Sequence, residues 1–542
     1  MGRQTSDKKD TFKDEEGTHL IKPVGKEERL RRANERKKKQ KRRRQQAKAS
    51  RGSETGTEGR GLPSLSNQAQ PEDGGPDEWS ALDTGHADDD YTTEPVDSVI
   101  LEYGKRASTR AMKEAEFLTR KADFVRSYIR SQSGLAQDHD HSCHPQAKKD
   151  VTVTVVDLID VQEKVFTICG CSPFDIQLLE ANCMTSSMDN PGVSFTTRCL
   201  EFYRQLNLKG QLSSQVFSKT LNAILSAKKD LYRSFLQSFK WYRAIKSASE
   251  QTDKVQFSIC PVCPPFDNIH LSLDACFGLR RRMKAGDSQS FIPDDTYCDP
   301  KSVFQFADAT ANQSASRDRS DCHDFQAEKQ ANRTYKSTDY LSEKGVMGLF
   351  CARHGFLLRM CDVFHGERFA YADYLLTDFL RGNGLTPEGL QQESRKIMLY
   401  YDIGCRYRPH LTNTELGDFP FVFLIPKFHV YAHGMSCLKE YHPASIKGAG
   451  HTDGETCERA WSYLGRFARI TREMSSGNRF DQLSDAKTHY NYTLLSGSLK
   501  LMSKKLIQIE PTIVSAISTL DAYRGNMTHT FFLPSRRPAS HR

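Results

Sequence analysis

The chain has 542 residues, a hydrophobic fraction of 37% and a formal net charge of +9. This length suits about two to four domains, and the low hydrophobic fraction predicts that part of the chain is disordered. No apolar run is long enough for a transmembrane helix, and the polar N-terminus lacks a signal-peptide core. Fifteen cysteines without a secretion signal favour a reducing compartment, in which close cysteine pairs are better explained as metal ligands than as disulfides.

The N-terminal part is expected to be unstructured. Residues 29–48, "RLRRANERKKKQKRRRQQAK", form a basic block typical of a nuclear localisation signal or a nucleic-acid-binding arm, although a charged helical surface has the same composition. Residues 50–97 are rich in Gly, Ser, Pro and acids, which predicts a linker. We therefore treat 1–97 as a disordered tail, first basic and then acidic.

The next two regions become progressively more structured. Residues 98–133 have apolar residues at helical spacing, so 98–150 is predicted to be a helical segment with a linker. Residues 151–250 begin with the strand candidate "VTVTVVDLI" and end with one or two helices over 211–249. This upstream domain is either α/β or mostly helical.

Residues 251–500 alternate strand-like and helical pieces, which indicates an α/β layer. A polar, irregular stretch inside it predicts an insertion at about 285–350. Residues 501–542 are expected to form a C-terminal helix and tail.

Three acids in this region stand where a metal could be held. Asp274 ends the alternating strand pattern of "NIHLSLD", and Asp402 follows the β-prone run in "YYDIGC". In "GAGHTDGETCERAWS" a glycine turn precedes a helix, which Thr452 or Asp453 can cap, and which places Glu455 and Glu458 on one face.

Carboxylates that converge repel each other unless they hold a hard cation such as Mg²⁺. Two such ions about 4 Å apart support phosphoryl transfer. From the pattern alone, the alternative is that these acids only terminate or cap their elements and never meet.

Several pieces in order make residues 255–500 similar to the Kyakuja-Dileera-Zisupton (KDZ) transposases. The pieces are "CPVCP", "LSLDACFGLRRR", "CHDFQA", "GLFCARHGFLLRMCDVFHGERFAYADYLL", "YYDIGCRY", "IPKFHVYAHGMSCLKEYHP" and "GAGHTDGETCERAWSYLGRFARITREMSSGNR". The similarity is weaker from about 151.

The resemblance implies a ribonuclease H-like core, with a mixed sheet flanked by helices, and a DDE active site that uses Mg²⁺ or Mn²⁺. Asp274 and Asp402 match the two aspartates. Glu458 is the favoured glutamate, and Glu455 is the alternative. The implied activity is hydrolysis at a transposon end followed by attack of the freed 3′ hydroxyl on target duplex DNA, in the nucleus. Multimers are a family-level expectation.

Basic residues after the first aspartate, Arg280, Arg281 and Arg282, would suit backbone phosphates, although a solvated strand edge is the alternative. His429 and His433 are four residues apart, so on a helix both could face a metal. The apolar run "FPFVFLIPKFHVYAH" looks more like a strand, which would also present both on one face. With Cys437, they are candidates for shaping the active site or the DNA path, and core histidines with satisfied hydrogen bonds are the alternative.

Two cysteine and histidine pairs have the spacing of a zinc knuckle. "CPVC" and "CARH" together give a Cys₃His set, which the resemblance also favours and which would staple the insertion to the core. Its members are Cys260, Cys263, Cys351 and His354. Cys322 and His323 could substitute or complete a second site, and unligated thiols are the alternative.

The upstream cysteines are poorly spaced for zinc. Cys169 and Cys171 have only one residue between them. Cys183 and Cys199 could complete a four-ligand set with them, but their spacing is poor. An upstream zinc module is therefore in doubt.

Two other functions share the same acids. One is a catalytically inactive, transposon-derived DNA-binding protein. The other is a ribonuclease H-type nuclease acting on RNA–DNA hybrids, which would need neither a zinc-stapled insertion nor a basic arm.

Overall fold

The computed structural model describes residues 12–13, 19–20, 96–133, 148–189, 191–226, 230–251, 257–310, 340–366 and 368–530. Contacts divide the chain into residues 1–93 and 94–542, which we treat separately. In the first unit, strands β1 (Phe12–Lys13) and β2 (His19–Leu20) pair antiparallel. The predicted basic block at 29–48, and the predicted linker up to residue 95, lie outside the described residues.

The upstream region of the second unit is α/β. Helix α2 (Val96–Gln132) precedes a four-stranded sheet in the order β4-β3-β6-β5, so the region adds a sheet to the expected helices. The strands are β3 (Lys148–Val156), β4 (Val161–Cys169), β5 (Cys183–Thr185) and β6 (Val193–Thr196). The helices are α3 (Phe174–Glu180), α4 (Thr197–Gly210), α5 (Ser214–Leu225) and α6 (Tyr232–Gln251).

Aromatic residues at helical spacing join α2 to α6. Phe117, Phe124 and Tyr128 follow one face of α2 and are buried. The Phe117 ring stacks on Trp241 of α6 at 5.3 Å, and Tyr128 meets Tyr242 edge-on at 5.9 Å. This packing fixes the long helix against the upstream sheet domain.

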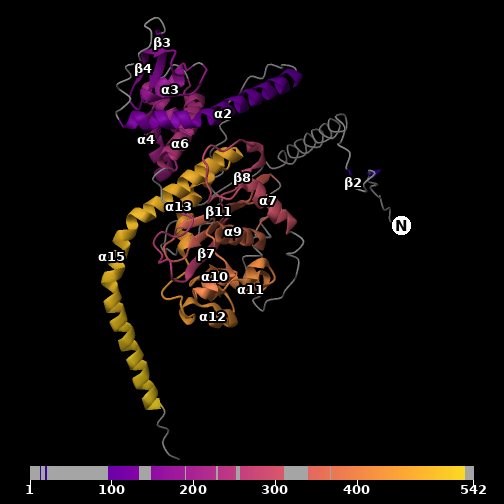
Figure 1. Ribbon diagram of the computed structural model, residues 1–542, viewed down its shortest axis with the longest axis vertical. Coiled ribbons are helices and arrows are strands. Elements are labelled where there is room, and N and C mark those ends of the chain that lie inside the picture. The colour runs from indigo at the N-terminus through magenta and orange to yellow at the C-terminus, as the bar shows by residue number, and fades with distance from the viewer. Residues whose placement is uncertain are drawn as a thin grey trace, which may run out of the picture. The chain divides into compact units, whose positions relative to one another are not determined.

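The second sheet forms the centre of the downstream region (Figure 1). Its five strands have the order β11-β10-β7-β12-β13. β10 runs antiparallel to β7 and β11, whereas β7, β12 and β13 are parallel. The strands are β7 (Ile269–Cys276), β10 (Gly345–Cys351), β11 (Leu357–Val363), β12 (Ile397–Tyr401) and β13 (Phe421–Leu424).

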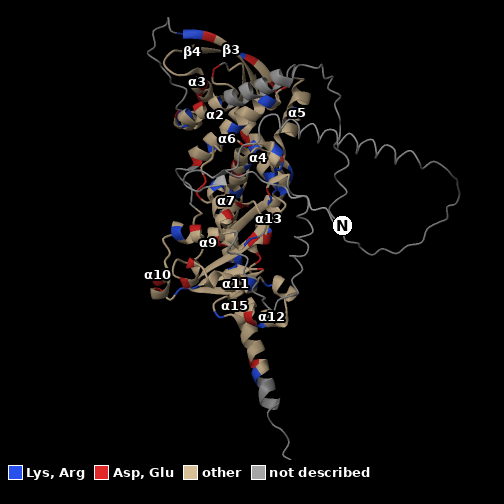
Figure 2. Ribbon diagram, turned by 90° about the vertical axis from the view of Figure 1, so that its right-hand side faces the viewer, with Lys and Arg blue, Asp and Glu red and all other residues tan. Residues whose placement is uncertain are grey.

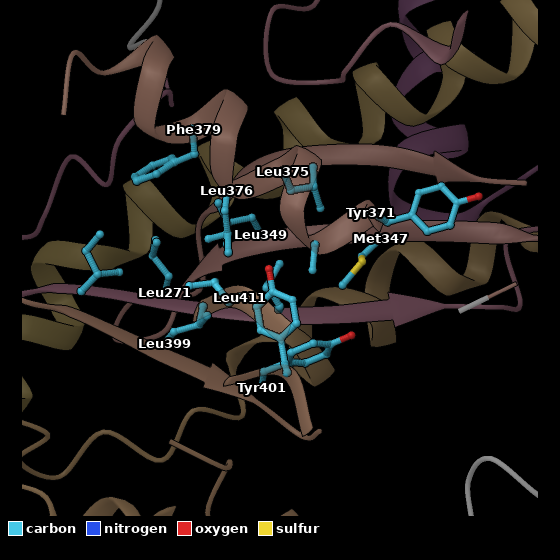
Figure 3. Packing of buried hydrophobic residues seen from close by; sticks show 14 of the residues in the cluster. Leu271, Met347, Leu349, Tyr371, Leu375, Leu376, Phe379, Leu399, Tyr401 and Leu411 are labelled. Carbon is cyan, nitrogen blue, oxygen red and sulfur yellow. The ribbon is translucent and has the colours of Figure 1, made fainter. Parts of the chain in front are cut away.

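Helices cover both faces of this sheet, which explains why every residue of β10, β11 and β12 is buried. On one face, Leu375, Leu376 and Phe379 of α9 (Phe369–Gly382) pack toward Leu271 and Leu349 (Figure 3). On the other face, Trp461 of α13 (Thr456–Leu464) meets Phe350 edge-on at 5.2 Å.

Other elements complete the downstream region. They are β8 (Arg281–Arg282), β9 (Leu341–Glu343), α7 (Pro300–Ala309), α10 (Pro387–Gln392), α11 (Gly404–Thr412), α12 (Met435–Tyr441), α14 (Ala468–Thr471) and α15 (Ser476–Thr530), with 3₁₀ turns at Met283–Ala285, Glu415–Asp418, His429–Ala432 (η7), Pro443–Ser445 and Gly465–Phe467.

Two boundaries differ from the expected pattern. The insertion predicted at about 285–350 contains α7, a segment at 311–339 outside the described residues, and then strands β9 and β10. The C-terminal helix α15 begins at Ser476, and Leu499, Leu506 and Ile513 along it are largely exposed. Most residues of this exposed part are uncharged (Figure 2). Among the described helices, none is long and apolar enough to cross a membrane.

Candidate functional site

Asp274 and Asp402 are brought together by the register of two neighbouring parallel strands. Leu273 of β7 pairs with Tyr401 of β12. The residue that follows each of them is an aspartate, Asp274 after Leu273 and Asp402 after Tyr401. Parallel neighbours lie about 4.8 Å apart across the sheet. β7 continues to Cys276, so Asp274 lies inside the strand and does not end it as the pattern predicted, whereas Asp402 does follow the last residue of β12.

Helix α13 is held against the same strands by hydroxyl groups. Thr456 Oγ1 lies 3.2 Å from Ser272 Oγ on β7 and donates to the carbonyl of Cys351 on β10. The turn before the helix needs Gly454, whose φ is +79°, because a Cβ there would lie 2.5 Å from Tyr400. The sequence pattern did not mark Thr456, Ser272 or Gly454, because their contacts are with residues far away in the chain.

The two glutamates of this helix have different surroundings. Glu455 is 7% exposed and is the N-cap residue of α13, but its side chain makes no capping hydrogen bond. The Asp453 carboxylate accepts a hydrogen bond from the backbone N–H of Glu455. The prediction that Thr452 or Asp453 caps this helix is therefore wrong, because the helix begins later in the chain than the pattern indicated. Glu458 lies one turn further on, and its side chain is 56% exposed.

The histidine pair does not lie on a strand, which corrects the expected placement. β13 ends at Leu424, and His429 begins the 3₁₀ turn η7 because Pro426 interrupts the strand run. His429 Nδ1 lies 3.2 Å from Glu455 Oε2, and its Nε2 lies 3.9 Å from Glu458 Oε1. His433 instead faces Cys405, with Nδ1 3.7 Å from Sγ.

Burial and mutual repulsion dominate the electrostatics of the acids. Burial, with the charges of Asp402 and Glu458, raises the pKa of Asp274 to about 8. Burial also raises the pKa of Asp402, although His429 and the Ile403 backbone N–H partly offset this. A divalent cation between these carboxylates would offset both effects, and carboxylate oxygens are the ligands that hard cations prefer. Among the described residues, the group of possible metal ligands that contains acids is Glu455 and Glu458 together with His429, whose ligand atoms lie within 4.8 Å of one another.

His429 carries the compensating charge. Its hydrogen bond with Glu455, and the charges of Glu455, Asp402 and Glu458, raise the pKa of His429 to about 9. Burial alone would raise the pKa of Glu455, but the hydrogen bonds with His429 and with the Phe428 backbone outweigh it and lower that pKa.

The four predicted zinc ligands converge. Cys260 and Cys263 precede β7, Cys351 ends β10 and His354 lies in the turn that follows, and their ligand atoms all lie within 4.8 Å of one another. His354 Nδ1 lies 3.3 Å from Cys263 Sγ and 3.5 Å from Cys260 Sγ.

These distances match the edges of a zinc tetrahedron. Bonds of about 2.3 Å to sulfur and about 2.0 Å to nitrogen place neighbouring ligands roughly 3.3–3.8 Å apart. Hydrogen bonds from Cys263 and Cys351 lower the pKa of Cys260, which favours the thiolate that a metal needs. The cluster is compatible with structural zinc.

The predicted DNA-contacting arginines have unequal surroundings. Arg281 is 2% exposed and donates to the Glu343 carboxylate at 2.5 Å and to the Gly286 carbonyl at 2.6 Å. This burial argues against a phosphate contact for Arg281. Arg282 pairs at 2.7 Å with Glu473 at the surface, and Arg280 is half-buried.

The remaining metal candidates do not extend the zinc cluster. Cys322 and His323 lie outside the described residues. Among the described residues, Cys169, Cys171, Cys183 and Cys199 form no group of three or more possible ligands. Burial raises the pKa of Cys183 to about 11 and of Cys199 to about 12, as in buried neutral thiols.

The downstream region is an α/β core in which two aspartates lie on or directly after neighbouring parallel strands and a Cys₃His cluster is compatible with zinc. Residues 267–491 match the family model of the Kyakuja-Dileera-Zisupton transposase. Residues 130–228 match the model of a CxC2-like cysteine cluster associated with KDZ transposases. Both matches support the KDZ family and indicate a transposase-derived protein. Neither the curated proteins nor the solved structures contain a match.

Proposed function

We propose that residues 267–491 form the catalytic core of a DDE-type DNA transposase, which cuts and joins phosphodiester bonds with Asp274, Asp402 and Glu458 as ligands of catalytic Mg²⁺ or Mn²⁺. The observation that carries this proposal is the paired register of the two aspartates on parallel strands. Support for the third ligand comes from electrostatics, because Glu458 raises the pKa of both aspartates.

The sheet supports a ribonuclease H-like core. Numbered along the chain, its strands lie in the order 3-2-1-4-5, with the second antiparallel to the first. Asp274 lies on strand one, and Asp402 directly follows strand four. An order in which the first and fourth strands are parallel neighbours is what such a site requires.

The chain's own residues would hold the reacting groups in place. The bound ions would activate a water or a 3′ hydroxyl and stabilise the leaving oxygen. Asp274 and Asp402 are fixed by the sheet, whereas Glu458 lies on a helix anchored by Thr456. Such positioning supplies much of the acceleration in phosphoryl transfer.

Partners and compartment follow from this function as further proposals. The substrate would be duplex DNA at transposon ends and at the target, with Arg280 and Arg282 at the backbone. The basic block at 29–48 would direct the chain to the nucleus or bind DNA, and a homo-oligomer would bring two ends together.

The test is strand cleavage of supercoiled and linear duplex DNA by the full chain with Mg²⁺ or Mn²⁺. Asp402→Asn is compared with the wild type and with Asp418→Asn, a matched exposed aspartate outside the site. We expect cleavage to fall by at least about 100-fold in Asp402→Asn only.

Other results would redirect the proposal. Equal behaviour of all three proteins, with DNA still bound, would indicate a catalytically inactive DNA-binding protein. Cleavage of an RNA–DNA hybrid in preference to duplex DNA would indicate a ribonuclease H-type nuclease.

A further inference from the structure

A second cluster of sulfur and imidazole ligands lies next to Asp402. Its members are Cys405, His433 and Cys437, whose ligand atoms all lie within 4.8 Å of one another. Cys405 and Cys437 are 7% and 5% exposed. These residues are separate from the Cys₃His cluster, and the sequence pattern had grouped only the last two with the active site.

The geometry of this cluster matches a metal better than ordinary core packing. The distance of 3.7 Å between Cys405 Sγ and His433 Nδ1 falls within the roughly 3.3–3.8 Å expected between two ligands of one zinc ion. The same spacing recurs in the Cys₃His cluster, where Cys351 Sγ and His354 Nδ1 are also 3.7 Å apart. Two thiols and an imidazole form the soft donor set that zinc prefers.

Each ligand belongs to an element that also shapes the acid site. Cys405 is the second residue of α11, which starts two residues after Asp402. His433 directly follows η7, the turn that begins with His429, and it also hydrogen-bonds the backbone of Asp402. Cys437 lies in the first turn of α12. An ion here would tie η7 and α12 to α11, which itself packs against β12 and β13.

We propose that Cys405, His433 and Cys437 form a second zinc site, which fixes η7 and the start of α11 and so positions His429 and Asp402. The described residues supply three ligands, so the fourth position is taken by water. On binding, each cysteine loses its thiol proton, and His433 coordinates as the neutral imidazole.

A disulfide between Cys405 and Cys437 is the competing chemistry. A disulfide would not explain why the His433 imidazole lies beside the two sulfurs, and a reducing compartment would disfavour disulfide formation. The two alternatives differ in zinc content and in mass, so both can be measured directly.

The test uses the full chain purified under reducing conditions, with bound zinc measured by elemental analysis. Cys437→Ser and His433→Ala are compared with the wild type and with Cys171→Ser, an exposed cysteine outside both clusters. We expect the first two variants to lose one zinc equivalent per chain and the control to lose none.

Cobalt provides a readout that does not depend on activity. Replacing zinc by Co²⁺ should give thiolate-to-cobalt absorption in the wild type. We expect this absorption to be weaker in Cys437→Ser and also in Cys263→Ser. In the double variant the decrease should equal the sum of the two single decreases. A circular dichroism melt identifies any variant that fails to fold, and His433→Ala, which keeps both thiols, then decides the result.

Unchanged zinc content and cobalt spectra in folded Cys437→Ser and His433→Ala would overturn the proposal. So would a Cys405–Cys437 disulfide found by mass spectrometry in the protein as purified. DNA cleavage is not needed for either result, so failure of the proposed transposase function would leave this test intact.

Discussion

His429 Nδ1 lies 3.2 Å from the buried carboxylate of Glu455. This contact gives Glu455 a partner of opposite charge, whereas Glu458, one helical turn further on, is exposed and lies 3.9 Å from His429 Nε2. The two glutamates that the sequence could not separate therefore have different surroundings. In the proposed site, Glu455 orients His429 and Glu458 is the third metal ligand.

Replacing each glutamate separately should distinguish these roles. Glu458→Gln removes a proposed metal ligand and should lower metal-dependent DNA cleavage by at least about 100-fold. Glu455→Gln should lower it less, because it acts through His429. Strand-cleavage rates measured at several Mn²⁺ concentrations check this. A larger loss in Glu455→Gln would reverse the assignment.

The His429–Glu455 pair should be visible in the titration of His429. We expect an NMR pKa of about 9 in the wild type and a value closer to the ordinary one in Glu455→Gln, since the hydrogen bond with Glu455 is the largest cause of the shift. Because the folded pKa lies above the unfolded one, stabilisation from this pair is complete below about pH 6.5 and is lost as the pH rises through about 9. An unshifted wild-type pKa would contradict the pair.

Asp274 should destabilise the metal-free fold as the pH rises. Its folded pKa of about 8 lies above the unfolded 3.8, so the folded state binds the extra proton between these values and stability falls across that window. Asp274→Asn removes this penalty and should be more stable than the wild type at pH 8 by several kcal/mol, because each pH unit between the two pKa values contributes about 1.4 kcal/mol, with little difference at pH 4. Denaturant unfolding without added Mg²⁺ measures this.

Added Mg²⁺ provides the control for that experiment. It should stabilise the wild type at pH 8 more than Asp274→Asn, because only the wild type keeps both aspartates. Asp418→Asn, at an exposed position, should behave as the wild type does.

The Cys₃His cluster and strand β7 were predictable from the sequence because they depend on short, regular spacings. The alternation of Ile269, Leu271 and Leu273 located β7, and the pair spacing located the Cys₃His ligands. Spacing could not show that Asp274 and Asp402 meet, because the register of β7 against β12 is set by tertiary packing.

Other features depended on contacts far apart in the chain. Arg281 was predicted to contact DNA because it stands in a run of arginines. In the structure it pairs with Glu343, which is 62 residues further along the chain. Pro426 ended the apolar run before His429, so His429 and His433 turn toward different clusters. Cys405 has no neighbouring cysteine or histidine in the sequence to mark it as a ligand.

Removal of zinc from the Cys₃His cluster should loosen the core. The cluster joins the segment before β7 to the end of β10, so Cys263→Ser should lose one zinc equivalent and at least about 2 kcal/mol of unfolding free energy. Cys171→Ser is the matched control. Equal melting temperatures and zinc contents in both variants would exclude a structural metal here.

The arginine run offers a test that separates packing from DNA contact. Arg281→Ala leaves the buried Glu343 unpaired and should cost about 3–5 kcal/mol of stability. Arg282→Ala breaks an exposed pair with Glu473 and should cost under about 1 kcal/mol. Chemical denaturation gives both values. A stable Arg281→Ala protein with weakened DNA affinity would restore the phosphate role.

The described chain on either side of residues 311–339 is attached to the core at two separate places. α7 is anchored by buried Val303 and Ala307, and β9 by the pairing of Arg281 with Glu343, so both ends of the segment between Thr310 and Tyr340 are fixed by residues outside it. Each flank is therefore held to the core by its own contacts, and losing the contacts of one flank would leave the other in place.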